Sequence, residues 1–169
     1  MGDDPEERVL SAQKKSDAEL VAATNRKARH DYTIETTWEA GLILVGSEVK
    51  SLREGQANLG DGYVMARRGE LWLLNVHIQE YAHANRFNHE PMRPRKLLLN
   101  AREIDDIIRQ IDEKNRVCVP LRLYFKEGRA KVEIATGVGK KLHDKRDSIK
   151  ERDAEREMLR LKRSKGVVD

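Results

Sequence analysis

Cysteine is almost absent from this sequence of 169 residues, and long apolar runs are lacking altogether. The single cysteine, Cys118, excludes a disulfide within the chain and a zinc cluster built from several thiolates. No stretch approaches the roughly 18 consecutive apolar residues of a membrane span. The first residues, MGDDPEERVLSAQKK, carry acids where a signal peptide carries bases, and no apolar core follows them. We therefore expect a cytoplasmic protein that does not enter a membrane.

Charge is abundant and unevenly distributed. Charged residues make up 37% of the chain, and the mean hydropathy is -0.74. The formal net charge of +4 divides into -3 for residues 1–24, +3 for 25–139 and +4 for 140–169. We expect a flexible acidic extension over 1–24, a folded body over 25–138 and a basic tail over 139–169. A basic tail on a nearly balanced body is a common arrangement for binding a polyanion, with nucleic acid as the first candidate.

Alternating apolar residues predict that the body is mostly strand. In YTIETTWEAGLIL (32–44), every second residue from the tyrosine onward is expected on one face. In ELWLLNVHI (70–78), the inward residues are expected to be Trp72, Leu74, Val76 and Ile78. RKLLLN (95–100) is a short strand with a basic entry.

The segment VCVPLRLYFKEGRAKVEIA (117–135) predicts a hairpin with Gly128 in the turn. Alternate residues from Val117 to Phe125 are expected to share one face, and Cys118 is expected to be a packing residue. Two inserted helices are predicted, one over SEVKSLREGQ with Ser47 as its N-cap and one over NAREIDDIIRQIDEKN with Asn100 as its N-cap. The predicted fold class is mainly β: a small OB-like antiparallel barrel with two to three inserted helices.

Two patterns raise the question of catalysis. His77, His83 and His89 recur at intervals of six, but they lack a cysteine partner and the HExxH arrangement, so we expect them to form hydrogen bonds in loops. Glu48-Val49-Lys50, with Glu39 upstream, resembles the acid and E-x-K arrangement around the magnesium ion of some nucleases. That motif belongs on a strand, whereas this segment favours a helix.

Two basic clusters favour RNA binding instead. NRKARHDY (25–32) combines bases with a histidine and a tyrosine, and RPRK (93–96) precedes a predicted strand. Arginine and lysine bind phosphates, while tyrosine and histidine can stack on unpaired bases. Gly137 and Gly139 follow a predicted strand without an apolar helix after them, which favours a flexible joint over a dinucleotide site.

The tail GKKLHDKRDSIKERDAERE (139–157) interleaves acids and bases. Like charges dominate at i,i+4 and opposite charges at i,i+3, and each pair is worth only about 0.2–0.5 kcal/mol, so the two sets largely cancel. Apolar support is thin. We expect the free tail to be largely disordered and to become helical against a partner that supplies the counter-charge.

Several long segments together resemble one family. They are NRKARHDYTIETTWEAGLILVGSEVKSLREGQANLGDGYV, NRFNHEPMRPRKLLLNAREID and LYFKEGRAKVEIATGVGKKLHDKRDSIKERD, which span most of 25–153 in the family's order. They are similar to the SsrA-binding protein (SmpB) family. The resemblance implies an OB-like barrel, no catalysed reaction and no cofactor. It also implies binding of transfer-messenger RNA (tmRNA) and its delivery to stalled ribosomes.

The resemblance also implies site residues. The tRNA-like domain of the RNA would contact a surface to which Glu39, Arg53, Leu98 and Asn100 correspond, with Tyr32, Lys50 and Lys96 near it. The tail would enter the empty mRNA channel and decoding centre of the ribosome as a helix. Its matching core is Gly139, Lys140, Lys141, His143, Asp144, Lys145 and Arg146.

The implied partners are transfer-messenger RNA and the ribosome, with alanyl-tRNA synthetase and elongation factor Tu reached through the charged RNA. We expect a monomer. A carboxylate such as Glu39 is repelled by phosphates, so we expect it to contact the amino group of a guanine or cytosine. Two alternatives stay open at this point: a metal-dependent nuclease using Glu39, Glu48 and Lys50, and a general OB-type RNA-binding protein.

Overall fold

Antiparallel strands form most of the body in the computed structural model, which describes residues 19–113 and 116–164. The elements follow in this order: β1 (Leu20–Thr24), α2 (Arg26–Asp31), β2 (Tyr32–Leu42), α3 (Gly46–Arg53), β3 (Ala57–Asn58), β4 (Tyr63–Arg67), β5 (Glu70–Leu74), β6 (His77–Ile78), the 3-10 turn η1 (Asn85–Phe87), β7 (Arg95–Leu98), α4 (Ala101–Asp112), β8 (Arg116–Lys126), β9 (Arg129–Gly139) and α5 (Leu142–Ser164).

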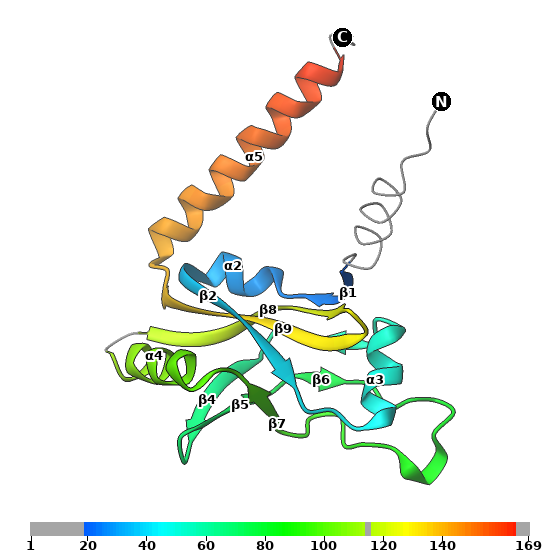
Figure 1. Ribbon diagram of the computed structural model, residues 1–169. Helices are drawn as coiled ribbons and strands as arrows, with labels where there is room; N and C mark the ends of the chain where they lie inside the picture. The colour runs from blue at the N-terminus through cyan, green and yellow to red at the C-terminus, as the bar shows by residue number, and fades with distance from the viewer. Residues whose placement is uncertain (1–18, 114–115, 165–169) are drawn as a thin grey trace, which may run out of the picture.

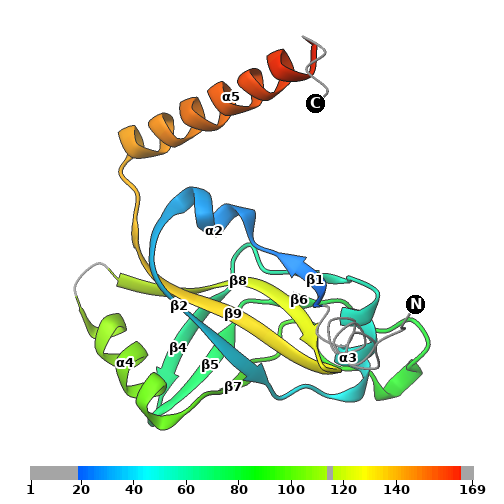
Figure 2. The same cartoon turned by 45° about the horizontal axis from the view of Figure 1, so that its top comes forward.

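Seven strands form one curled sheet in the order β1-β8-β9-β2-β7-β5-β4, and β3 pairs with β6. No ladder among the described residues joins β4 to β1, so the OB-like barrel is open along one side. Figures 1 and 2 show α2 against one face of the β8–β9 layer, α4 on the opposite side and α3 at the far end of the sheet. The mainly β, OB-like class predicted from the sequence is confirmed.

The β8–β9 hairpin turns at Glu127 and Gly128, whose φ angles of 51° and 74° suit the two positive-φ positions of a tight hairpin turn. Its predicted single apolar face is wrong. The register shifts between Pro120 and Arg122, so the residues after the shift point to the opposite face from the one that the alternation predicts. Leu121 therefore packs under α2 in a small second cluster, whereas Leu123 enters the main core. Cys118 is buried in the main core as a packing residue.

β2 changes faces in the same way. Its pairing with β9 shifts between Ile34 and Thr36, so Tyr32 and Ile34 pack with the cluster under α2 while Trp38 and Ala40 reach the main core. The prediction of one continuous apolar face from Tyr32 onward is wrong for this reason. A single extra residue in a strand is enough to reverse its later side chains.

β5 buries the residues that the period-two prediction placed outward. Leu71 and Leu73 are fully buried, while Trp72 and Leu74 are half-buried. Asn75 then adopts a positive φ of 56°, and this turn returns the following apolar residues, Val76 and Ile78, to the core. Buried and exposed residues do alternate, but the turn at Asn75 changes the buried positions from odd-numbered residues before it to even-numbered residues after it.

The two predicted helices exist, with one correction. α4 begins after Asn100, whose amide donates to Oε2 of Glu103 at 3.2 Å, as the capping-box spacing predicts. α3 begins after Val45 and not after Ser47, because the carboxylate of Glu48 receives the Val45 amide at 3.0 Å. Residues 26–31, expected only as part of a basic cluster, form α2 in the structure.

The body begins earlier than predicted. Residues 20–24, placed in the flexible extension, form β1 and pair with β8 from Leu20↔Phe125 to Thr24↔Arg122. Leu20 and Val21 are exposed on this edge strand, and Ala22 and Ala23 pack against the core. The charge-based boundary was misplaced because the last residues before Asn25, LVAAT, are uncharged and belong to the sheet. Residues 1–18 lie outside the described part of the chain.

The tail forms α5, which extends away from the body in Figures 1 and 2. The expected disorder of the free tail is therefore wrong for residues 142–164. The helix has neither glycine nor proline, and Leu, Met, Arg, Lys and Glu dominate it, all of which favour helix. Among residues 19–113 and 116–164, no helix combines the length and apolar character needed to cross a membrane.

The two glycines near the end of β9 have different roles, and this difference is testable. A Cβ on Gly137 would stand 2.5 Å from the carbonyl oxygen of Thr33, whereas a Cβ on Gly139 would meet nothing within 4 Å. Gly137 is thus a packing residue and not a joint. We predict that Gly137→Ala lowers the free energy of unfolding by about 1–3 kcal/mol, measured by urea denaturation.

Gly139→Ala is the matched control, and its expected change is within about 0.5 kcal/mol. Equal stability of the two variants would contradict the packing role of Gly137.

Candidate nucleic-acid interface

A buried carboxylate, that of Glu48 on α3, is paired with an arginine of β7. Glu48 and Arg95 both have fully buried side chains, and Nε of Arg95 donates to Oε1 of Glu48 at 2.8 Å. Arg93 donates to Oε2 of Glu48 from Nη2 at 2.7 Å and to Oε1 from Nε at 3.2 Å. With the amide of Val45 at 3.0 Å, Glu48 has four donors.

Arg95 also donates hydrogen bonds to two backbone carbonyls. Its Nη1 donates to the carbonyl of Val76 at 2.7 Å, and its Nη2 donates to that of Pro91 at 3.0 Å. One guanidinium on β7 therefore fixes α3 through Glu48, the turn after β5 through Val76 and the loop before β7 through Pro91. This fork of fixed donors is specific to arginine.

The ion pair governs the protonation of Glu48. Burial alone would raise the pKa of this carboxyl, but the hydrogen bond from Arg93, the Val45 amide and the charges of Arg95 and Arg93 outweigh it and hold the pKa below its ordinary value. Glu48 is therefore ionised at neutral pH, as two adjacent guanidinium groups require.

Two sequence hypotheses are corrected by this cluster. Arg93 and Arg95 of the RPRK cluster are occupied by Glu48 and by backbone carbonyls, so neither is arranged to bind phosphate. The nuclease hypothesis fails because its three residues do not meet. Glu48 is buried in the ion pair, Lys50 is exposed with its Nζ 5.4 Å from the Tyr81 ring centroid, and Glu39 is hydrogen-bonded to Tyr124 on another strand.

The histidines form local contacts. His89 is buried, with Nε2 2.8 Å from the carbonyl oxygen of Ile78 and Nδ1 2.8 Å from Oγ of Ser47. His83 lies edge-on to Tyr81 at 5.4 Å, and His77 is exposed on β6. Across residues 19–113 and 116–164, no three His, Cys, Asp or Glu side chains form a group that could hold a metal ion.

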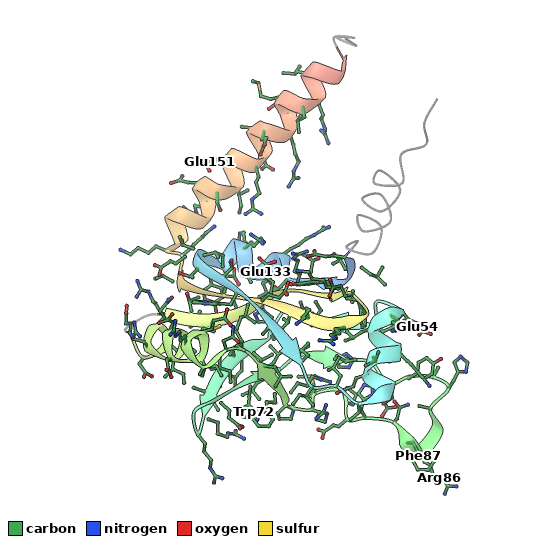
Figure 3. The ribbon with its side chains drawn as sticks, in the orientation of Figure 1. Glu54, Trp72, Arg86, Phe87, Glu133 and Glu151 are labelled. Atoms are coloured by element: carbon green, nitrogen blue, oxygen red, sulfur yellow. The ribbon has the colours of Figure 1, made fainter. Side chains whose placement is uncertain are left out.

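The strands β7, β2, β9 and β8 present a face opposite the main core, which we call the outer face. Cross-strand pairing places Leu98, Gly41, Lys131 and Tyr124 in one row and Glu39, Glu133 and Arg122 in the next. α2 covers the other half of the same surface. Glu133 is labelled in Figure 3.

Glu39 is held in place on the outer face. The hydroxyl of Tyr124 donates to its Oε2, and Nζ of Lys126 lies 3.5 Å from the same oxygen. The hydrogen bond from Tyr124 has the largest effect on the pKa of Glu39 and lowers it. Burial raises the pKa by less, and the charges of Lys126 and Lys131 lower it further. Arg122 covers the Tyr124 ring at 4.4 Å and is itself paired with Glu133 and Glu19.

A shallow groove adjoins this carboxylate. Leu98 is half exposed beside Gly41, where a Cβ would stand 3.3 Å from the Leu98 Cβ. Gly41 and Leu98 line a hollow of about 340 Å³ together with Phe125 and Lys131. The guanidinium of Arg53, on α3, lies 5.3 Å from the Phe125 ring centroid at the edge of this hollow.

Of the predicted residues, Glu39 and Leu98 share the outer face, since Leu98 pairs with Gly41, two residues along β2 from Glu39. Arg53 lies on α3 beside Phe125, whose ring packs in the main core. Lys96 shares the outward side of β7 with Leu98 and pairs with Glu70 at 2.6 Å, and Asn100 caps α4 two residues beyond Leu98. Lys50 lies one turn from Arg53 but faces Tyr81. Tyr32 begins β2 under α2, away from Glu39.

Sequence reasoning missed four residues of this surface: Arg122, Tyr124, Lys126 and Lys131. The signal was present in the hairpin, where polar and basic residues alternate on the outward side close to the turn. The register shift in β8 hid it, because the outward phase cannot be extended through an extra residue.

The start of the tail lies at the other end of β2. The Lys140 amide donates to the carbonyl of Asp31 at 2.8 Å, and Nζ of Lys140 donates to that of Arg29 at 3.2 Å. The C-terminal end of α2 therefore anchors the chain just before α5. Gly139, Lys141 and Arg146 are exposed, and the side chains of His143, Asp144 and Lys145 lie outside those described.

Comparison with known proteins identifies the family. A family model described as "SmpB protein" matches residues 22–164. The chain belongs to the SmpB family. The outer face, the groove and α5 all lie inside the matched region.

Individual relatives agree. The chain is 56% identical over 147 residues to an "SsrA-binding protein" of Desulforudis audaxviator (strain MP104C), covering 87% of this chain and 96% of the relative. It is 53% identical over 150 residues to one of Mycolicibacterium smegmatis (strain ATCC 700084 / mc(2)155), covering 88% and 93%. A solved structure described as "tmRNA-SmpB: a journey to the center of the bacterial ribosome" has a chain that is 42% identical with a TM-score of 0.62, covering 71% of this chain and 85% of that one.

The buried ion pair generates a pH-dependent prediction. Glu48→Gln leaves two guanidinium groups without their counter-charge, so we expect a loss of about 3 kcal/mol in the free energy of unfolding at pH 7. Because the folded-state pKa of Glu48 is lowered, its contribution is present above the ordinary carboxyl pKa of about 4.3 and disappears as pH falls through the folded value. The difference between wild type and variant should therefore narrow toward pH 3, as measured by urea denaturation.

Glu54→Gln, at the exposed C-cap of the same helix, is the control and should change stability by less than about 0.5 kcal/mol. A Glu48→Gln deficit that is the same at pH 7 and pH 3 would contradict the ionised pair.

Proposed function

We propose that this chain binds transfer-messenger RNA through its outer face and carries it to stalled ribosomes for trans-translation, in which incomplete proteins are tagged and the ribosome is released. The observation that carries the proposal is the joint match to SsrA-binding proteins and to a chain of the tmRNA–SmpB ribosome structure. The family consists of RNA-binding factors and not of enzymes, so we assign no reaction to the chain. The match gives no support to the nuclease or the general RNA-binding alternative.

The outer face has the chemistry that a folded RNA elbow requires. Lys126 and Lys131 on the outer face, with Arg53 of α3 beside the groove residue Phe125, offer positive charge for phosphates. Half-exposed Leu98 beside Gly41 can pack on a base face. Glu39 is ionised and fixed by Tyr124 and Lys126, so it can accept a hydrogen bond from an amino group of guanine or cytosine. Asn100, Lys96 and Lys50 border this surface, while Tyr32 would contact RNA only from the α2 side.

The second part of the proposal concerns the tail. We place α5 in the empty mRNA channel, with Gly139, Lys140, Lys141, His143, Asp144, Lys145 and Arg146 at the decoding centre. α5 alternates acids and bases along an exposed helix, and its apolar residues Ile149, Met158 and Leu159 are exposed. None of these three apolar side chains is buried against the part of the body that the structure describes, and a channel lined with phosphates would attract the bases of the helix.

The remaining partners follow from the cargo. Transfer-messenger RNA charged by alanyl-tRNA synthetase and carried by elongation factor Tu would bring both proteins into the same complex, with one copy of this chain for each RNA. The protein would act as a monomer in the cytoplasm, where ribosomes translate.

The proposal predicts two separable functions. Glu39→Ala should weaken binding to transfer-messenger RNA about tenfold, since a good base contact is worth about 1–3 kcal/mol, and Asp106→Ala on the exposed side of α4 should leave binding unchanged. A chain truncated after Gly139 should bind the RNA like the full chain but fail to support tagging on stalled ribosomes in a reconstituted translation system.

Each of the two predicted functions has a result that would contradict it. Tagging by the truncated chain at the level of the full chain would remove the role of α5. Wild-type affinity of Glu39→Ala would remove the outer face as the RNA surface, even if the tail result held.

A further inference from the structure

Phe87 is the most exposed of the large apolar side chains in the described chain, with 84% of its surface accessible. It ends η1 at the tip of the loop between β6 and β7, and Figure 3 shows it with Arg86 pointing away from the body. Leu98, which we place at the RNA surface, is 50% exposed. A phenyl ring displayed to this extent has no packing role in the body.

The loop that displays Phe87 is held firmly at its base. The side chain of Asn88 accepts from the amide of Tyr81 at 3.0 Å and donates to the carbonyl of Tyr81 at 2.7 Å, which closes the loop. Buried His89 contacts Ile78 and Ser47, and the carbonyl of Pro91 receives both the Ile78 amide at 3.0 Å and Nη2 of Arg95. The ring is therefore presented from an ordered base.

Aromatic rings and cations alternate around this loop. The Arg86 guanidinium lies 5.8 Å from the Phe87 ring centroid. Tyr81 contacts His83 edge-on and has the Lys50 ammonium 5.4 Å from its ring centroid. Neither Lys50 nor Arg86 forms an ion pair with a described residue. Rings flanked by guanidinium or ammonium groups are the chemistry that proteins use to stack unpaired nucleobases.

Charge alone does not explain the loop. Glu80 and Glu90 lie at its base and outnumber Arg86 within residues 80–90, so it is a poor phosphate site. The ring itself is the feature that can contribute binding. Base stacking on an aromatic side chain does not require a positive field.

The loop is continuous with the outer face through α3. Lys50 faces the Tyr81 ring of the loop, and Arg53, on the same helix, faces Phe125 at the groove. Arg95 fixes both parts, since it holds α3 through Glu48 and the loop through Pro91. Val49 of α3 also lines the groove, so this one helix adjoins both the groove and the loop.

We propose that Phe87 is a stacking platform for an unpaired nucleobase of the RNA bound to the outer face. This inference rests on the proposed function. It adds a second contact to that function, in the loop between β6 and β7 rather than in the groove.

The test uses the full-length chain and transfer-messenger RNA in an equilibrium binding assay. Phe87→Ala should weaken binding about tenfold, within the range found for removal of one stacked base, and the dependence of affinity on salt should keep its slope because no phosphate contact is lost. Phe87→Trp should bind like wild type. Its indole should be quenched on binding, after subtraction of the signal that Trp38 and Trp72 give in the wild-type chain.

Met92→Ala, which removes another exposed apolar side chain before β7, is the matched control and should bind normally. Wild-type affinity of Phe87→Ala together with an unquenched indole in Phe87→Trp would overturn the inference. A defect of Phe87→Ala in tagging alone, with normal RNA affinity, would also overturn it, because the ring would then serve the ribosome. Failure of the wild-type chain to bind the RNA would instead overturn the proposed function.

Discussion

The buried pair between Glu48 and Arg95 is the interaction on which the functional surface depends. It joins β7 to α3, and through its other donors Arg95 also fixes the turn after β5 and the loop before β7. Taking two charges out of water is costly, and a buried pair is tolerated only when its remaining hydrogen-bonding groups are satisfied. Here the Arg93 guanidinium and the Val45 amide complete the set around Glu48. The groove and the Phe87 loop both lie on elements that this pair holds.

Two register shifts decide which part of the sheet is available to a partner. In β2 the shift falls between Ile34 and Thr36, and in β8 it falls between Pro120 and Arg122. Apolar residues before the shifts, such as Ile34 and Val119, pack in the cluster under α2, whereas polar residues after them, such as Glu39 and Arg122, face outward. One surface of a single sheet is thus divided into a covered half that anchors the tail and an open half that we assign to RNA.

The sequence predicts the strand-rich class, the β8–β9 turn and the cap of α4, because these depend on local alternation and local hydrogen bonds. It does not predict the phase of β5, which depends on the positive φ of Asn75, or the role of RPRK, since pairing of Arg95 with Glu48 joins residues far apart in the chain. β1 was missed because five uncharged residues next to an acidic segment carry little periodic signal. The helix α5 was expected only against a partner, because charge pairs alone neglect the helix propensity of its residues. The expected RNA contacts came from the family resemblance, and the structure adds the strand pairing that puts Glu39 and Leu98 on one face.

The most direct test of this account compares two arginine-to-lysine variants at the same carboxylate. Arg95→Lys cannot keep all three donor contacts of the fork, while Arg93→Lys changes a partly exposed donor and leaves Arg95 in place. With both variants shown to be folded by circular dichroism, the dissociation constant for transfer-messenger RNA should rise about tenfold for Arg95→Lys, although Arg95 is buried and cannot touch RNA. That of Arg93→Lys should stay near wild type. Wild-type affinity in folded Arg95→Lys would contradict the claim that the buried pair positions the RNA surface.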